Sequence, residues 1–148
     1  MGKGKRKKPF AEKAPGAIEK TPRGNVPPNY DEQVPSWRFS SLQTVEPFGW
    51  HEITREDLDL VLTQLKGFET MTWTQIKSEV KRKSHFVEAS KICKKARERL
   101  NALGSQVDVD LLFSLRLTGK GRVWGFLRRG ILDILWWDPK HEVWPISH

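Results

Sequence analysis

A late histidine and a group of basic side chains are the residues best suited to chemistry. His141 titrates near neutrality, so it could act as a general acid or base, with Asp138 or Glu142 orienting it. The basic side chains nearby are Arg116, Lys120, Arg122, Arg128 and Arg129. Cleavage of RNA by its own 2′-hydroxyl needs a proton acceptor, a proton donor and cations for the phosphorane charge. Guanidinium groups bind phosphate through paired hydrogen bonds, so this set suits that reaction without a metal.

Each of these residues also has a purely structural interpretation. A histidine that follows Asp138-Pro139 is more often exposed to solvent or used as a cap, and Asp138 can itself cap the turn. Asp138 and His141 make a pair of possible metal ligands without a third, so we predict no metal site and no cofactor. His51 and His85 are isolated in the sequence, and we assign them no role.

The candidate residues lie in a C-terminal segment with the pattern of an antiparallel β-meander. Apolar and other residues alternate from Leu111 to Thr118, which is the two-residue period of a strand buried on one face. Glycines in residues 118–121 and 129–130 indicate turns, so Arg116 and Arg122 should be neighbours across the first hairpin. The predicted strands cover residues 111–117, 122–128, 131–137 and 141–144, the third of them central because both its faces are apolar.

Two residues inside these strands carry further expectations. Gly125 indicates a bulge or a close approach of another group, because glycine has no side chain to pack. Asp133 is the one charged residue of the apolar third strand, and it needs a partner if it is buried.

The preceding residues predict a leading strand and two or three helices. The strand covers residues 37–45 and joins the sheet at an edge or beside a central strand. Thr54 is a suitable N-cap for a first helix ending near Gly67, and Thr72 with Gln75 has capping-box spacing for a second. A third helix is predicted over about residues 87–103. This order predicts an α+β fold with the helices packed on one sheet face.

The third predicted helix has an apolar side and a cationic side. A charged helix face is usually only its solvated side. Here two glutamates offset five cations, so we keep Lys94 and Lys95 as candidate nucleic-acid contacts.

Composition limits the class of protein. The 148 residues suit one domain, residues 37–148, behind a basic and proline-rich tail, residues 1–36, that we expect to be disordered. The single cysteine, Cys93, permits no internal disulfide, and no apolar run is long enough for a membrane span, so we expect a cytoplasmic protein. The net charge of +8 favours an anionic partner such as RNA or a ribosome.

Two segments resemble parts of the RelE/ParE-like superfamily, the bacterial toxins of type II toxin–antitoxin pairs: LFSLRLTGKGRVWGF and ILWWDPKHEVWP. The resemblance implies that Arg122 steadies the scissile phosphate and that His141 acts as general acid. RNA-cleaving members often carry a tyrosine after that histidine or at the chain end, whereas this chain has Trp144, which cannot transfer a proton as a phenol does. Trp144 could instead stack on a base.

The resemblance implies a toxin-like RNA endonuclease of the mRNA interferase type, associated with the ribosome and bound by an antitoxin protein. Trp136 and Trp137 point to opposite faces of their strand, so the ring opposite the helices would offer an apolar patch to such a partner. The alternative is a non-catalytic module of the same fold that binds nucleic acid or protein. A third possibility is a topoisomerase-poisoning toxin of the same fold.

Overall fold

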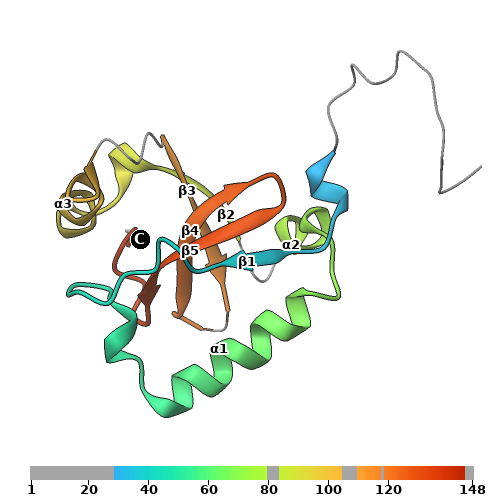
Figure 1. Cartoon of the computed structure of the whole chain (residues 1–148), viewed down its shortest axis with the longest axis horizontal. Coiled ribbons are helices and arrows are strands. Elements are labelled where there is room, and N and C mark those ends of the chain that lie inside the picture. The colour runs from blue at the N-terminus through green and yellow to red at the C-terminus, as the bar shows by residue number, and fades with distance from the viewer. Residues whose placement is uncertain (1–28, 80–83, 105–109, 118, 146–148) are drawn as a thin grey trace, which may run out of the picture.

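The computed structural model describes residues 29–79, 84–104, 110–117 and 119–145. This part of the chain contains three α-helices and a five-stranded mixed sheet, which confirms the predicted α+β class (Figure 1). The strands lie in the order β1-β5-β4-β3-β2. Strand β1 is parallel to β5, and the other neighbours are antiparallel. The strands are β1 Ser36–Arg38, β2 His85–Glu88, β3 Leu111–Arg116, β4 Arg122–Arg128 and β5 Ile131–Asp138.

The predicted meander is present as β3, β4 and β5. Arg116 lies opposite Arg122 in the first hairpin, as the alternation and the turn predicted. The second hairpin turns through Arg129 and Gly130, both with positive φ (56° and 79°), as expected for a type I′ turn between right-twisted strands. Strand β5 lies between β1 and β4, so its predicted inner position is confirmed.

Gly125 marks both a bulge and a close approach. The register of β4 against β5 shifts between Trp124 and Gly125. A Cβ at Gly125 would collide with the carbonyl oxygen of Asp133. Only glycine therefore lets the two backbones come this close.

The leading strand is shorter than predicted. It ends at Arg38, and the chain after it bonds to the Asp133 side chain instead of continuing the strand ladder. Asp133 is half-buried, and its carboxylate accepts hydrogen bonds from the amide (3.3 Å) and hydroxyl (2.9 Å) of Ser41. The chain then continues along β5, where Gln43 donates to the Leu135 carbonyl and Trp137 donates to the Phe48 carbonyl, both at 3.0 Å. Residues after β1 therefore bond to the backbone of β5 over the part of the strand that β1 does not reach.

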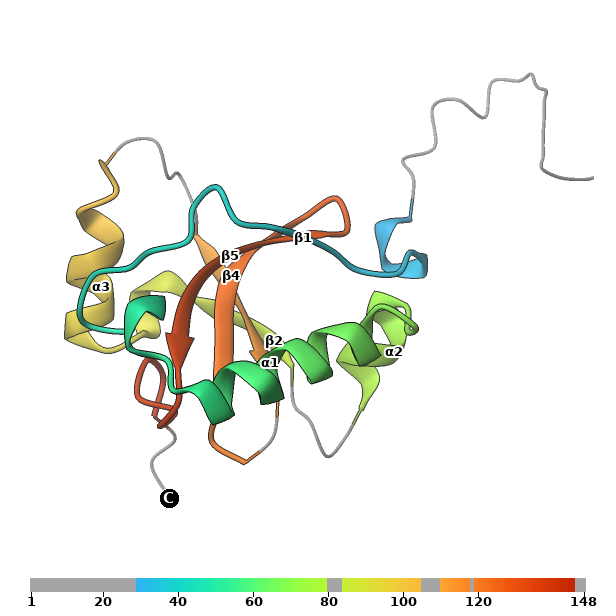
Figure 2. The same cartoon turned by 60° about the horizontal axis from the view of Figure 1, so that its bottom comes forward.

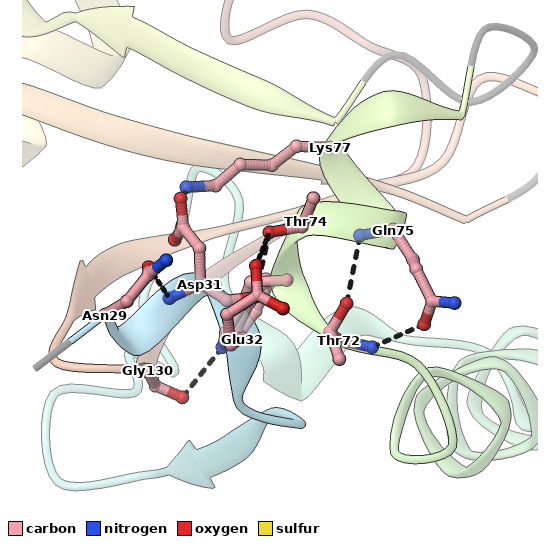
Figure 3. Close-up of polar contacts among 9 residues, drawn as sticks. Asn29, Asp31, Glu32, Thr72, Thr74, Gln75, Lys77 and Gly130 are labelled. Carbon is pink, nitrogen blue, oxygen red and sulfur yellow. Dashed lines mark hydrogen bonds and ion pairs between the residues drawn. The ribbon is translucent and has the colours of Figure 1, made fainter.

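Helices α1 (Arg55–Phe68) and α2 (Trp73–Ser78) begin where the capping signals predicted. The Thr54 hydroxyl accepts from the Asp57 amide at 3.1 Å. Thr72 and Gln75 form a reciprocal capping box at the start of α2, visible in Figure 3. Both helices therefore start as local sequence dictates.

Helix α2 also holds a short 3₁₀ helix, η2 (Tyr30–Glu32), against the domain. The Lys77 Nζ lies 2.9 Å from an Asp31 carboxylate oxygen, and the Thr74 hydroxyl donates to Glu32 at 3.3 Å (Figure 3). Residues 29–36, which the prediction assigned to the tail, thus include η2, held by these contacts, and Ser36, the first residue of β1. Residues 1–28 lie outside the described part of the chain.

The third predicted helix is wrong over its first half. Residues His85–Glu88 form β2, and Ala89–Lys91 form a 3₁₀ turn before α3, Lys94–Asn101. Val87 pairs with Leu112 of β3, so pairing across the sheet overrides the local helical pattern.

The helices do not share one sheet face. Alternate residues of β3, β4 and β5 feed two separate apolar clusters. One cluster contains Phe68 of α1 and Trp73 of α2, and the other contains Ala96 of α3. Figure 2 shows α1 and α3 on different sides of the sheet. The predicted one-sided packing is therefore wrong, because a sheet that is apolar on both faces needs cover on both. None of the helices in the described ranges is long and apolar enough to cross a membrane.

Candidate functional site

Two arginines and two histidines meet where β3 ends and β4 begins. We call His85, Arg116, Arg122 and His141 the arginine–histidine site. Arg116 and Arg122 are paired in register, and the guanidinium Nη2 of Arg122 lies 3.5 Å from Nδ1 of His141. The predicted pair, Arg122 and His141, is therefore in contact. Arg122 and Trp124 are two residues apart on β4, so the site lies on the sheet face that α3 covers.

Arg122 is the most buried member of the site, with 6% of its surface exposed. Its Nη1 donates to the carbonyls of Gly119 (3.0 Å) and Gly121 (3.2 Å) in the β3–β4 turn. Burial and the neighbouring charge of Arg116 lower the pKa of Arg122 to about 10, while Asp138 raises it. Arg122 is thus charged at neutral pH and fixes both the turn and the His141 ring.

Asp138 is fully buried beneath the site and holds the turn that carries His141. Its carboxylate accepts from the amides of Glu142 (2.8 Å) and Val143 (3.0 Å) and from the indole of Trp124 (3.1 Å). Burial raises the pKa of Asp138, and these hydrogen bonds oppose that rise. The predicted role of Asp138 as a turn cap is confirmed.

His141 is held in one orientation and one tautomer. A guanidinium can only donate, so Nδ1 of His141 must accept from Arg122, and the proton of the neutral ring sits on Nε2. Burial, followed by the charge of Arg122, lowers the pKa of His141, and Asp138 opposes the shift. The backbone of His141 has φ 59°, a left-handed conformation that is uncommon for a side-chain-bearing residue. Strain of this kind is concentrated at functional sites.

His85 was missed by the sequence prediction. Its Nδ1 lies 3.0 Å from the Phe86 carbonyl, which can only accept, so the neutral ring carries a lone pair on Nε2. The ring centroid lies 5.2 Å from that of Trp144, and its charge is one of the causes that lower the pKa of His141. His85 and Val87 are two residues apart on β2 and so share a sheet face, and recognising that strand would have placed His85 beside β3, opposite Ser114.

The other predicted contacts divide between this site and distant positions. Lys120 is exposed in the β3–β4 turn, between the glycines that bind Arg122. Lys94 and Lys95 are exposed at the start of α3, which is tied to the turn of His141 by a 2.7 Å hydrogen bond from the Cys93 amide to the Val143 carbonyl.

Arg128 and Arg129 lie at the opposite end of the β4–β5 hairpin. Arg128 is six positions after Arg122 along β4, a span of roughly 20 Å at the usual rise of a strand. The predicted set of basic residues is therefore not one surface.

Residues 141–144 form no strand, contrary to prediction. The amides of Glu142 and Val143 donate to the Asp138 carboxylate, so they cannot also bond to a neighbouring strand. The segment therefore turns back beneath the end of the sheet. This turn brings Trp144 to His85 instead of to a strand edge.

No family model matches the chain, and neither a curated protein nor a solved structure matches it. Within the described ranges, no group of three or more His, Cys, Asp or Glu side chains could hold a metal ion.

Proposed function

We propose that the protein is an endoribonuclease that cleaves RNA by attack of the 2′-hydroxyl on the adjacent phosphate, with no metal in the mechanism. The observation that carries the proposal is that two imidazoles in complementary tautomers lie near two guanidiniums: His141 contacts Arg122, which is paired with Arg116, and His85 is close enough for its charge to lower the pKa of His141. His85 presents a lone pair at Nε2 and can accept a proton. His141 presents an N–H group at Nε2, which can donate its proton once the ring is also protonated at Nδ1, so the two rings can supply the base and the acid of the reaction.

His85 accepts the proton of the 2′-hydroxyl at Nε2 while a bond forms between the 2′ oxygen and phosphorus. Arg116 binds the phosphate, because it is half-buried and no carboxylate pairs with its guanidinium among the described residues. The bond between phosphorus and the 5′ oxygen then breaks, which leaves a 2′,3′-cyclic phosphate.

The leaving 5′ oxygen takes its proton from Nε2 of the His141 imidazolium. The bound phosphate supplies the negative charge that favours this charged form, against the effect of Arg122. Protonation at Nδ1 also ends the contact with Arg122, since both groups are then donors, and frees that guanidinium for the phosphate. Solvent returns the protons after the products leave.

The wider assignment is that of a RelE/ParE-like toxin that acts on messenger RNA at the ribosome in the cytoplasm and is neutralised by an antitoxin. The resemblance of residues 112–126 and 134–145 and the net charge of +8 support it. Trp144 replaces the tyrosine of RNA-cleaving members, and in this mechanism the second imidazole, His85, supplies the missing proton-transfer group.

The alternative function is binding of nucleic acid without cleavage. The observation that favours it is the structural use of Arg122, whose Nη1 is already committed to two turn carbonyls. In that case Arg116 and Trp144 would bind a phosphate and a base, and the histidines would only shape the surface.

A cleavage assay on RNA with mass analysis of the products tests the proposal. The expected product ends in a 2′,3′-cyclic phosphate, and a strand with a single 2′-deoxy sugar resists cleavage at that position. His85→Gln and His141→Asn abolish cleavage, while His51→Asn, at an exposed position outside the site, does not. Salt-sensitive binding without cleavage by the wild-type protein would establish the alternative.

A further inference from the structure

A pocket of about 360 Å³ lies at the end of the β4–β5 hairpin that is away from the arginine–histidine site. Its walls are formed by Arg38, Phe126, Arg128, Arg129, Ile131 and Asp133. None of these residues belongs to the arginine–histidine site, and the length of β4 separates the two.

The topology explains why this pocket is open. Phe126 belongs to the same apolar cluster as Ala96 of α3, so the pocket starts on the face that α3 covers. In Figures 1 and 2 the turn between β4 and β5 extends away from α3, so the helix does not cover this end of the hairpin. Arg38 comes from β1, where it is paired in register with Asp133.

The pocket carries an excess of positive charge. Three guanidiniums and one carboxylate line it, so its formal charge is 3 − 1 = +2. Among the described residues no ion pair joins Arg38, Arg128 or Arg129 to an acidic side chain. The Asp133 carboxylate is occupied by the amide and hydroxyl of Ser41. The three cations therefore have no anionic partner within the described part of the protein.

Arg128 is held in place without a ligand, and Arg129 stands at an unusual backbone position. The Arg128 guanidinium carbon lies 5.3 Å from the centre of the Phe126 ring, a cation–π contact that positions it. Arg129 occupies a left-handed backbone position (φ 56°) of a two-residue turn that favours asparagine or glycine. The sequence thus places a guanidinium where turn geometry alone would select a smaller residue.

We propose that this pocket binds a phosphomonoester, the terminal phosphate of a free nucleotide or of an RNA strand. A phosphomonoester carries a charge of about −1.5 to −2 near neutral pH, which matches the formal charge of the pocket. A pair of its oxygens can accept two parallel hydrogen bonds from one guanidinium, the two-pronged geometry that arginine offers. A phosphodiester within a strand carries one charge and two free oxygens, so it would be bound less well.

Binding is measured by isothermal titration calorimetry on the full chain with adenosine 5′-monophosphate, adenosine, and a 2′-O-methyl RNA oligonucleotide, which the proposed reaction cannot cleave, with and without a 5′-phosphate. Adenosine monophosphate is expected to bind and adenosine is not. Stronger binding of the 5′-phosphorylated strand than of the free nucleotide would identify an RNA end as the source of the phosphate. Stronger binding of the free nucleotide would identify the nucleotide as the source. Equal binding of the two oligonucleotides together with no binding of the nucleotide overturns the proposal.

Arg129→Asn is the decisive variant, because asparagine suits the left-handed backbone and the substitution removes the guanidinium. It is expected to weaken binding of the nucleotide by roughly tenfold, the effect of losing one charge-assisted interaction. Asp133→Asn is expected to strengthen binding, since it removes the one negative charge while keeping an acceptor for Ser41.

One control separates this pocket from a general effect of positive charge. Arg97→Gln removes an exposed arginine of α3 and should leave nucleotide binding unchanged. Equal losses in Arg97→Gln and Arg129→Asn would show a non-specific cationic effect, and unchanged binding in Arg129→Asn would place the nucleotide elsewhere in the protein; either result overturns the proposal. Because the assay measures no cleavage, the two proposals fail independently.

Discussion

Arg122 and His141 share one hydrogen bond, from guanidinium Nη2 to imidazole Nδ1 at 3.5 Å. Because the guanidinium can only donate, this contact fixes the tautomer of the neutral imidazole and directs its N–H group away from Arg122. The buried carboxylate of Asp138 holds the backbone of the turn and makes no hydrogen bond to the imidazole among those of the described residues. An arginine thus orients His141, where the sequence suggested an acidic side chain.

The pKa of His141 should be measurably depressed. Burial and the charges of Arg122 and Arg116 disfavour the imidazolium, so the midpoint of an NMR titration of its ring carbons should lie below the usual 6.5. Arg116→Gln removes one of these charges without breaking a structural bond of the site and should raise the midpoint. A midpoint at or above 6.5 in the wild type would contradict the arrangement.

The lowered pKa of His141 also makes the stability of the fold depend on pH. The folded state binds a proton at His141 less readily than the unfolded state, so His141 lowers the stability as pH falls through the window from 6.5 down to its depressed pKa. His141→Asn, which suits the left-handed backbone, should remove this part of the pH dependence. Urea unfolding at pH values across that window, with His51→Asn as control, measures it.

The rate of cleavage should depend on pH through His141. His141 must be protonated in the proposed reaction, so the rate should fall as pH rises above the depressed pKa of His141. His141→Asn should remove this loss from any residual activity. A rate that rises steadily with pH in the wild type would exclude His141 as the acid.

Asp138→Asn should destabilise the fold. The carboxylate accepts three hydrogen bonds from N–H groups while fully buried, and an amide turns one of its ends into a donor facing a donor. A loss of about 2–4 kcal/mol in the free energy of unfolding is expected. Asp59→Asn, on the exposed side of α1, is the matched control and should change the stability little.

Substitution by alanine should lower the free energy of unfolding at Gly125 and raise it at Gly67. Gly125→Ala forces a Cβ against the Asp133 carbonyl and should cost about 1–3 kcal/mol or more. Gly67→Ala lies within α1 with no atom within 4 Å of the new Cβ, and should stabilise by about 0.5–1 kcal/mol. Urea unfolding of both variants tests the bulge directly, because equal effects would show that the backbones at Gly125 are not close.

The features that the sequence predicted correctly depend on short-range signals. Alternation and glycine-rich turns predicted the two hairpins and so the pairing of Arg116 with Arg122. The threonine caps predicted the starts of α1 and α2. The contact of Arg122 with His141 was predicted only as a hypothesis, because it depends on how the turn after β5 folds back.

The features that were missed depend on contacts between distant residues. Strand β2 has a pattern that also fits a helix, and only its pairing with β3, more than twenty residues later, selects the strand. His85 could not be placed without that pairing. The position of α3 on the second face could not be predicted either, because it follows from the apolar character of both sheet faces together.

The parallel pairing of β1 with β5 has a consequence for synthesis. Trp37 lies beside Leu132, which the ribosome adds ninety-five residues later, so the first strand waits for its partner through most of translation. Contacts so distant in sequence slow folding. The arginine–histidine site needs β3, β4 and the turn after β5, so a nascent chain carries its basic residues past the ribosome before it can assemble the site.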